Sequence, residues 1–323
     1  MPSPIFDRSN LKIKPLSHRV HDLNVSSILE LDTPVFFKNK YNFKCVSENI
    51  TQAKKEQKSI ILMMGGHLIR SGVQKYIIDL MTRGYISCLS MNGSGIIHDF
   101  EFALIGETTE SVSRYIQTGE FGLWRETGYL NDIINDAFQN NPHAGMGEAV
   151  GQALLNGDYP FKHLSILAIA SKLKIPVTVH VGIGYDIIHE HPNCDGAATG
   201  ALSYNDFLKY VEIVGNLEGG VVMNFGSAVM APEVFLKALS MARNVARQDG
   251  KEIRRFTTLV CDLHDLPEDY RSEVSKKQSG YYFRPWKTML VRTVSDGGQS
   301  FYVRGRHEQT FPTLWTTINS AEL

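Results

Sequence analysis

Two short glycine-rich segments could bind the phosphates of a nucleotide. Gly65-Gly66-His67 and Asn92-Gly93-Ser94-Gly95 each follow an apolar run and precede a segment with helical periodicity. Glycine lets a backbone turn tightly or approach a ligand closely, and the free N–H groups at the start of a helix attract phosphate. One pair of glycines is equally consistent with a tight turn alone. Two such segments after neighbouring strands favour a nucleotide site.

Side chains that bind metal ions gather in another part of the chain. They lie between residues 180 and 195: His180, His189, His191 and Cys194, with Asp186 and Asp195. Zinc prefers these ligand types, although the spacing matches no standard structural zinc site. Acid–base catalysis by His98 or His189 is an alternative, because imidazole titrates near neutrality. A histidine that is simply hydrogen-bonded is the remaining possibility.

The elements that must position these residues are predicted from apolar runs. Five runs are expected to be strands: 60–64, 85–91, 175–181, 219–227 and 256–261. Helical periodicity between them indicates an α/β, doubly wound, mostly parallel sheet with helices on both faces. Ligands of such sheets bind outside the carboxyl ends of the strands. Trp286–Val294 and Ser300–Arg304 are expected to form two further strands joined by a hairpin at Asp296-Gly297-Gly298.

Charged residues near the end of the chain have two interpretations. Asp262, His264, Asp265, Glu268 and Asp269 follow the fifth expected strand. They could bind an amine or a ribose hydroxyl, or form a solvated loop in which Asp265 caps a helix. Arg304, Arg306 and His307 could contact a phosphate or be surface charge.

The composition narrows the function classes. The chain has 323 residues, 43% of them hydrophobic and 21% charged, with a formal net charge of −1. This balance gives no electrostatic argument for nucleic acid or for an anionic membrane. No apolar run approaches the roughly 20 residues of a spanning helix, and the first residues lack the apolar region of a signal peptide. The four cysteines are far apart and are expected to be free thiols, so a cytoplasmic protein is expected.

The domain organisation is expected to be simple. Residues 1–24 are polar and are interpreted as an arm over the surface or onto a partner subunit. Residues 25–323 contain no linker rich in Pro, Gly or Ser and no repeat, so a single Rossmann-like domain is expected.

Several motifs resemble the deoxyhypusine synthase family in order and spacing. They are Gly65–Gln74, Met91–Phe100, Gly119-Glu120-Phe121 with Arg125-Glu126, Lys174–Val177, Tyr185–Ile188, Gly219–Val222, Trp286-Lys287 and Phe311-Pro312. The similarity spans residues 20–318 with sparse identities. Enzymes of that family are tetramers with a Rossmann-like core. They use NAD to oxidise spermidine, hold its aminobutyl group as an imine on a lysine, and pass it to an acceptor amine.

The resemblance implies a role for each matching position. The NAD site would contain Gly65, Gly66, His67, Ser71, Asn92, Gly93, Ser94, Gly95, Gly119, Glu120, Gly182, Gly184, Gly219 and Gly220. Asp262 of the acidic segment is expected there as well, as a partner of a ribose hydroxyl. Lys287 would form the imine, and Asp186 also matches the family pattern. His98 is expected to be a further catalytic residue because its imidazole suits acid–base work. An amine substrate would contact Asp186, Asn224, Asp269 and Trp286. An imine-forming lysine must have a lowered pKa, so that its free amine can attack.

The chain also departs from the family pattern. The glycine that separates the tryptophan from the lysine is absent before Lys287, and the paired glutamates of the polyamine site are replaced by Ile97 and His98. Asn224 stands where the family has a histidine. Since several carboxylates must offset the desolvation of a polyamine, we expect an NAD-dependent transferase with an altered amine substrate. A non-catalytic nucleotide-binding homologue and a metal-assisted enzyme that uses the His180–Cys194 cluster are the alternatives.

Overall fold

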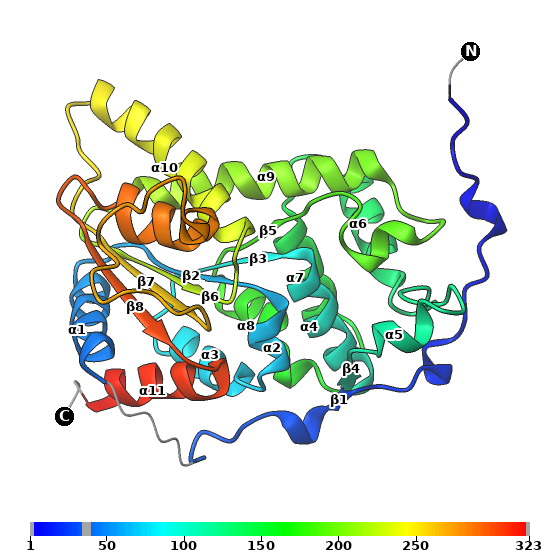
Figure 1. Cartoon of the computed structure of the whole chain (residues 1–323). Helices are drawn as coiled ribbons and strands as arrows, with labels where there is room; N and C mark the ends of the chain where they lie inside the picture. Colours follow the sequence, from blue (N-terminus) through cyan, green and yellow to red (C-terminus); the bar gives the residue numbers. More distant parts are fainter. Residues whose placement is uncertain (1–2, 34–39, 321–323) are drawn as a thin grey trace.

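The computed structural model describes residues 3–33 and 40–320. Within these residues, six strands form one parallel sheet in the order β5-β3-β2-β6-β7-β8 (Figure 1). The strands are β2 (Ile60–Met64), β3 (Cys88–Asn92), β5 (Val177–His180), β6 (Val221–Phe225), β7 (Thr257–Asp262) and β8 (Gln299–Arg304). Two short strands, β1 (Leu23–Asn24) and β4 (Glu107–Thr108), pair antiparallel beside it.

Helices cover both faces of the sheet. They are α1 (Tyr41–Lys55), α2 (Gly66–Arg70), α3 (Gln74–Thr82), α4 (Gly93–Ile105), α5 (Val112–Tyr115), α6 (Tyr129–Asn140), α7 (Met146–Asn156), α8 (Ile166–Leu173), α9 (Gly196–Gly215), α10 (Met230–Gln248), α11 (His307–Ser320) and the π-helix η7 (Trp286–Arg292). Short 3₁₀ turns lie at Arg8–Asn10, Leu16–His18, Val25–Ser27, Lys162–Leu164, Ile187–Glu190 and Ser279–Tyr282. In Figure 1, α9 and α10 lie along one side of the sheet, while α1, α3 and α11 lie along the other.

The central strand shows why the sheet is buried on both faces. Ile60, Leu62 and Met64 point into one hydrophobic cluster, and Ile61 and Met63 point into the other. A strand that contacts helices on both sides must be apolar at every position. The continuous run Ile60–Met64 satisfies this requirement, and all five residues are at most 1% exposed.

The topology confirms the predicted Rossmann-like, doubly wound fold. The chain moves outward from β2 to β3 and β5, returns to the other side of β2 at β6, and moves outward again through β7 and β8. This is the strand order 3-2-1-4-5-6 of dinucleotide-binding domains. The order reverses between β2 and β6, which makes this pair the switch point of the sheet.

One secondary-structure prediction is wrong. Trp286–Val294 was expected to be a strand, but Trp286–Arg292 forms η7, with Trp286, Met289 and Leu290 buried against the sheet. Buried residues three and four apart suit a helix, and their β-branched and aromatic neighbours misled the prediction. The expected hairpin is also wrong, because β8 pairs parallel with β7.

The N-terminal residues pack on their own chain. Leu16 is buried against Tyr115 and Trp124, and Lys14 forms a parallel bridge with Trp124. Figure 1 shows this segment running down one side of the molecule and along its lower edge. The arm therefore brings residues near position 19 to the carboxyl ends of β3 and β5.

The described residues bear on two expectations from composition, which concern membrane-spanning helices and the cysteines. No helix in the described part of the chain is long and apolar enough to cross a membrane. Cys45, Cys88, Cys194 and Cys261 are free thiols, as predicted.

Candidate functional site

The loops that follow β2 and β6 touch at the switch point. The Gly65 N–H donates to the Phe225 carbonyl oxygen at 3.2 Å. A Cβ atom at Gly65 would lie 2.9 Å from the Gly226 carbonyl oxygen, and Gly226 has a φ of +69° that favours glycine. The two backbones can approach this closely because neither residue has a side chain. Gly65 is buried in this contact, and Gly226 is partly exposed at the edge where ligands of such sheets bind.

A pocket of about 330 Å³ opens beside this contact, over the ends of β6 and β7. We call it the crevice pocket; His67, Ser71, Gly226, Asp262, Arg306 and His307 line it. Burial lowers the pKa of His67 and of His307, so both imidazoles are neutral at neutral pH. The Asp262 carboxylate accepts hydrogen bonds from the backbone of Leu263 and His264 at the end of β7.

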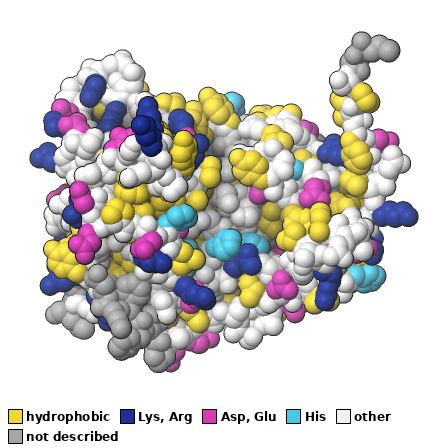
Figure 2. All heavy atoms as spheres, viewed as in Figure 1, with side chains coloured by type: hydrophobic (Ala, Val, Ile, Leu, Met, Phe, Trp, Pro, Cys, Tyr) yellow, Lys and Arg dark blue, Asp and Glu magenta, His cyan; other side chains and the backbone are white. Residues whose placement is uncertain are grey.

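A second pocket of about 290 Å³ lies on the other side of α2, over the ends of β3 and β5. We call it the acidic pocket, because Glu101, Glu110 and Asp186 line it together with Arg19, Arg70 and His98. Ile97, Val112, Phe121 and Ile187 form its apolar wall. Histidine side chains lie with Lys or Arg side chains near the middle of the face seen in Figure 2.

A buried ion pair forms the floor of the acidic pocket. Both terminal nitrogens of Arg19 donate to Glu101, at 2.8 and 2.7 Å, and the hydroxyls of Thr108 and Thr127 donate to the same carboxylate. Burial acts to raise the pKa of Glu101, but Arg19 and the two hydroxyls hold it below its ordinary value. Glu101 therefore stays ionised, and its charge is neutralised by Arg19.

This network determines which nitrogen of His98 carries the proton. The hydroxyl hydrogen of Thr108 is donated to Glu101 at 2.6 Å, so the Thr108 oxygen can only accept from His98 Nδ1, 2.9 Å away. Burial lowers the pKa of His98 to about 4. The ring is therefore neutral with its proton on Nδ1, and Nε2 keeps a free lone pair.

Asp186 lies against the first turn of α4. A Cβ atom at Gly93 would come within 2.1 Å of Asp186 Oδ2, so only glycine leaves room for this carboxylate. Burial raises the pKa of Asp186 to about 6, although the Ser94 backbone N–H acts to lower it. The side chain is 8% exposed, and its Oδ2 has no hydrogen-bond partner among the described residues. The positive end of α4, expected to face a phosphate, thus faces a carboxylate of the chain itself.

The helix α2 joins the two pockets. His67 lines the crevice pocket and Arg70 lines the acidic pocket, one helical turn apart, with Arg70 Nη1 3.5 Å from His67 Nε2. The charge of Arg70 lowers the pKa of both His67 and His98. The pockets are therefore neighbours at one edge of the sheet.

Most predicted residues near the first two glycine segments lie at this edge. Asn92 accepts from the hydroxyl of Ser94 and from the N–H of Gly95, and so caps α4. Gly66 packs against Ser94 and His98. Gly119 and Gly184 have positive φ and open space beside them, and Glu120 pairs with Lys14 of the arm. Gly182 packs against the ring of Tyr185.

Gly219 and Gly220 are not part of this arrangement. They precede β6, and the Gly220 carbonyl oxygen accepts from Thr257 at the start of β7. They therefore lie at the amino edge of the sheet, a full strand length from Gly65. Their role is to begin β6, where a Cβ at Gly220 would lie 2.4 Å from the Ser59 carbonyl oxygen.

The residues expected to contact an amine are dispersed. Lys287 lies on η7 with its ammonium group 4.1 Å from the centre of the Tyr281 ring, and it lines neither pocket. Trp286 is 5% exposed and donates from Nε1 to the Tyr270 carbonyl oxygen. Asn224 is buried. Its side-chain amide donates to the Ser227 carbonyl oxygen and accepts from the Ser227 N–H. Asp269 is exposed and accepts from Ser272.

The side chains of the proposed metal-binding alternative do not come together in a cluster. Among residues 3–33 and 40–320, no group of three or more His, Cys, Asp or Glu side chains could hold a metal ion. The ring nitrogens of His180 and His191 face Thr178 and the Gly122 carbonyl oxygen. His189 Nδ1 accepts from two backbone N–H groups, and the Cys194 carbonyl oxygen accepts from Arg8.

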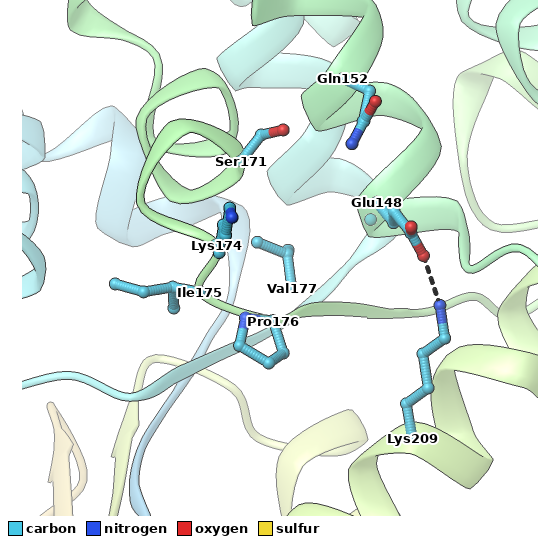
Figure 3. Close-up of a pocket in the computed structure, with 9 residues that line it drawn as sticks. Glu148, Gln152, Ser171, Lys174, Ile175, Pro176, Val177 and Lys209 are labelled. Atoms are coloured by element: carbon cyan, nitrogen blue, oxygen red, sulfur yellow. Dashed lines mark hydrogen bonds and ion pairs between the residues drawn. The ribbon is translucent and has the colours of Figure 1, made fainter.

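Another pocket lies at the opposite end of β5. It is about 410 Å³ in volume and is lined by Lys174–Val177, which lead into that strand. Figure 3 shows Glu148 and Lys209 pointing toward each other across it, where they form an ion pair. The charged side chains of this pocket include the Glu148–Lys209 ion pair, and the pocket is remote from the switch point.

Sequence reasoning missed Arg19, Glu101 and Glu110 of the acidic pocket. Glu101 follows the second glycine segment by two turns of α4, in the region where the family's glutamates were sought. The sequence separation between Asn92 and Glu101 could have indicated that Glu101 belongs to this site. Arg19 carried no such signal, because it comes from a polar arm far away in sequence.

No protein-family model matches the chain, and no curated protein matches its sequence. Solved structures do match. A conserved protein of Methanococcus maripaludis S2, provisionally described as a LOR/SDH protein, is 16% identical with a TM-score of 0.53, over 92% of this chain and 74% of that one. Unliganded AgrE is 11% identical with a TM-score of 0.51, over 89% of this chain and 34% of AgrE. The chain thus spans about a third of AgrE.

A protein of Entamoeba histolytica, provisionally described as a deoxyhypusine synthase, is also among the matches. It is 10% identical with a TM-score of 0.45, over 86% of this chain and 87% of that one. Identities this low show a shared fold and no more. The chain is therefore a Rossmann-like α/β protein, similar in fold to LOR/SDH-like and AgrE proteins.

Proposed function

We propose that this chain binds a nicotinamide dinucleotide at the switch point and uses it in a reaction on a cationic amine. The observation that carries the proposal is the pair of adjoining pockets on the two sides of α2, at the carboxyl edge of a sheet with dinucleotide-binding strand order. A cofactor and a substrate bound there would be neighbours. NAD is the preferred dinucleotide, since AgrE has been solved with ornithine and NAD+.

The residues of the crevice pocket fit a dinucleotide. Gly65 and Gly226 let the two backbones meet between β2 and β6, and the partly exposed Gly226 lines the pocket. Arg306 supplies donors for phosphate oxygens, and Asp262 at the end of β7 can accept from a ribose hydroxyl. The Ser71 hydroxyl also lies in this pocket, where it donates to the His67 carbonyl oxygen. When bound, the nicotinamide ring would supply a hydride acceptor.

The acidic pocket fits the amine. Asp186 has one carboxylate oxygen to which no described residue bonds, and an ammonium group placed there would satisfy it and keep it ionised. His98 offers the lone pair of Nε2 to a proton released from the amine nitrogen, because its other nitrogen is held by Thr108. The apolar wall excludes water from the reacting group. No step here uses Lys287, so imine formation on that lysine stays a separate prediction.

Calorimetric titration of the full chain with NAD+ tests the cofactor half. Wild type should bind, and Ser71→Asp should weaken binding at least tenfold, since the new carboxylate would repel the phosphates. Ser240→Asp on the exposed side of α10 is the matched control and should bind as wild type does. Equal NAD+ affinity in wild type and Ser71→Asp, or no binding by wild type, would contradict the proposal.

Turnover tests the amine half. With NAD+ and a panel of primary amines, wild type should produce NADH absorbance at 340 nm, or amine transfer detected by mass spectrometry. His98→Gln should lower kcat by at least tenfold, because glutamine cannot take up the proton. Binding of NAD+ without turnover of any amine would favour the non-catalytic alternative.

A further inference from the structure

We infer that the acidic pocket takes a ligand that carries a carboxylate as well as an ammonium group, so that the substrate class is an amino acid. The inference rests on the proposed function and names the substrate of that same site. It depends on which charged groups of the pocket are already paired within the protein.

Arg70 supplies a positive charge that has no carboxylate partner among residues 3–33 and 40–320. Its only hydrogen-bond contact within the part of the chain that the structure describes is the neutral His67 ring, at 3.5 Å. Arg19, by contrast, is paired on both terminal nitrogens with Glu101. A guanidinium group binds a carboxylate in a two-pronged geometry that gives specificity as well as energy. Arg70 is therefore available to a carboxylate of the ligand.

The complementary groups lie deeper in the same pocket. Asp186 is 8% exposed, and its Oδ2 has no partner in the described part of the chain; His98 presents an unprotonated Nε2. Both atoms can only accept hydrogen bonds while Asp186 is ionised, so they call for a donor such as an ammonium group. Glu110 is already occupied, because it accepts from Trp124 Nε1 and from the Gly122 N–H.

These charges disfavour a polyamine. An elongated polycation bound to Asp186 would place a further ammonium group close to Arg70, and like charges this near repel each other. A ligand with a carboxylate at that end turns the repulsion into an ion pair. The volume of about 290 Å³ lies at the lower end of the range for small-molecule pockets. The apolar wall would cover the carbon chain between the two charged groups.

Matched ligands test this inference on the full chain with saturating NAD+. The probes are the straight-chain amino acids from glycine to 6-aminohexanoate and the alkylamines of the same carbon number, titrated by calorimetry. At least one amino acid should bind tenfold or more tightly than its alkylamine. In Arg70→Gln this ratio should fall to about one, while the alkylamine affinity stays within about threefold of wild type.

Arg247→Gln, at the exposed end of α10, is the control and should keep the wild-type ratio. The inference is overturned if every alkylamine binds as tightly as its amino acid, if the preference survives in Arg70→Gln, or if no probe binds. The NAD+ titration of the same samples separates the two claims. NAD+ binding without a preference for amino acids removes the inference alone, whereas failure to bind NAD+ removes the proposed function.

Discussion

Asp186 and His98 owe their chemistry to burial beside fixed partners. Burial raises the pKa of the Asp186 carboxyl to about 6 and lowers that of the His98 imidazole to about 4. Between about pH 4 and pH 7, the His98 ring is mostly neutral, while the Asp186 carboxyl is still partly protonated. Above pH 6 both groups are acceptors, as the proposed binding of an ammonium group requires.

The affinity for a cationic amine should therefore depend on pH through Asp186. Its ionised fraction rises about tenfold from pH 5 to pH 7 if its pKa is about 6, so the association constant should rise about tenfold over that interval. Calorimetry at a series of pH values measures this, and Asp186→Asn should bind weakly with a flat profile. A flat profile in wild type would contradict the role given to Asp186.

Asp206 is a second buried carboxyl, and its effect is on stability. Its Oδ2 accepts from the N–H groups of Gly147 and Val179, while Oδ1 has no partner among the described residues. Burial raises its pKa to about 7. A raised pKa favours the folded state at low pH, and that contribution is lost as the pH rises through the folded value.

Asp206→Asn should remove this pH dependence. Relative to wild type, the free energy of unfolding of the variant should increase by about 1–4 kcal/mol between pH 4 and pH 7, since each pKa unit is about 1.4 kcal/mol. Urea denaturation at several pH values measures the difference. A difference that does not change with pH would show that Asp206 titrates normally in the folded protein.

At the scale of elements, the first turn of α4 positions the residues of the proposed amine site. Glycine at position 93 leaves space for Asp186, and Asn92 caps the helix that carries His98 and Glu101. The turn thus arranges acceptors for a cation. It was predicted to bind phosphate, because a glycine-rich turn looks the same in sequence whether it faces a ligand or another loop of the chain.

Gly93→Ala should weaken amine binding without affecting NAD+. The new Cβ would lie 2.1 Å from Asp186 Oδ2 and force the carboxylate away, so amine affinity should fall at least tenfold. The control is Gly200→Ala in α9, where a Cβ meets open space and should stabilise by about 0.5–1 kcal/mol. Unchanged amine affinity in Gly93→Ala would show that Asp186 does not hold the amine.

The strands were more predictable than the loops between them. Ile60–Met64 is a continuous apolar run, and Phe256–Cys261 is apolar except for Thr257 and Thr258. The structure makes each of them an interior strand of the sheet. Segment 286–294 mixes apolar and polar residues and packs as a helix, which the spacing of its buried Trp286, Met289 and Leu290 suits. Gly219-Gly220 resembled a ligand turn, yet its position before a strand places it at the other edge of the sheet.

At the scale of the whole molecule, the arm is part of the site. Arg19 reaches from it to Glu101, 82 residues later in the chain, and both side chains are 1% exposed. Local sequence could not reveal this pairing, because nothing near Arg19 indicates where the arm lies. The fold class was predictable from periodicity, whereas the charges that meet in the acidic pocket come from four distant segments.

Arg19→Met should lower the free energy of unfolding by about 3–5 kcal/mol, because Glu101 would remain buried without its cation. Chemical denaturation measures the loss, and Arg125→Met at an exposed position is the control. The double variant with Glu101→Gln should recover part of the stability. A loss below 1 kcal/mol in the single variant would mean that the arm does not hold Arg19 against Glu101 in solution.

The central claim, that a dinucleotide lies across the switch point, is tested most directly by a crystal structure of the full chain with NAD+. The account predicts the pyrophosphate beside Gly65–His67, between the ends of β2 and β6, with one nucleoside in the crevice pocket. NAD+ bound at the amino edge of the sheet, near Gly219 or Lys174, would contradict it.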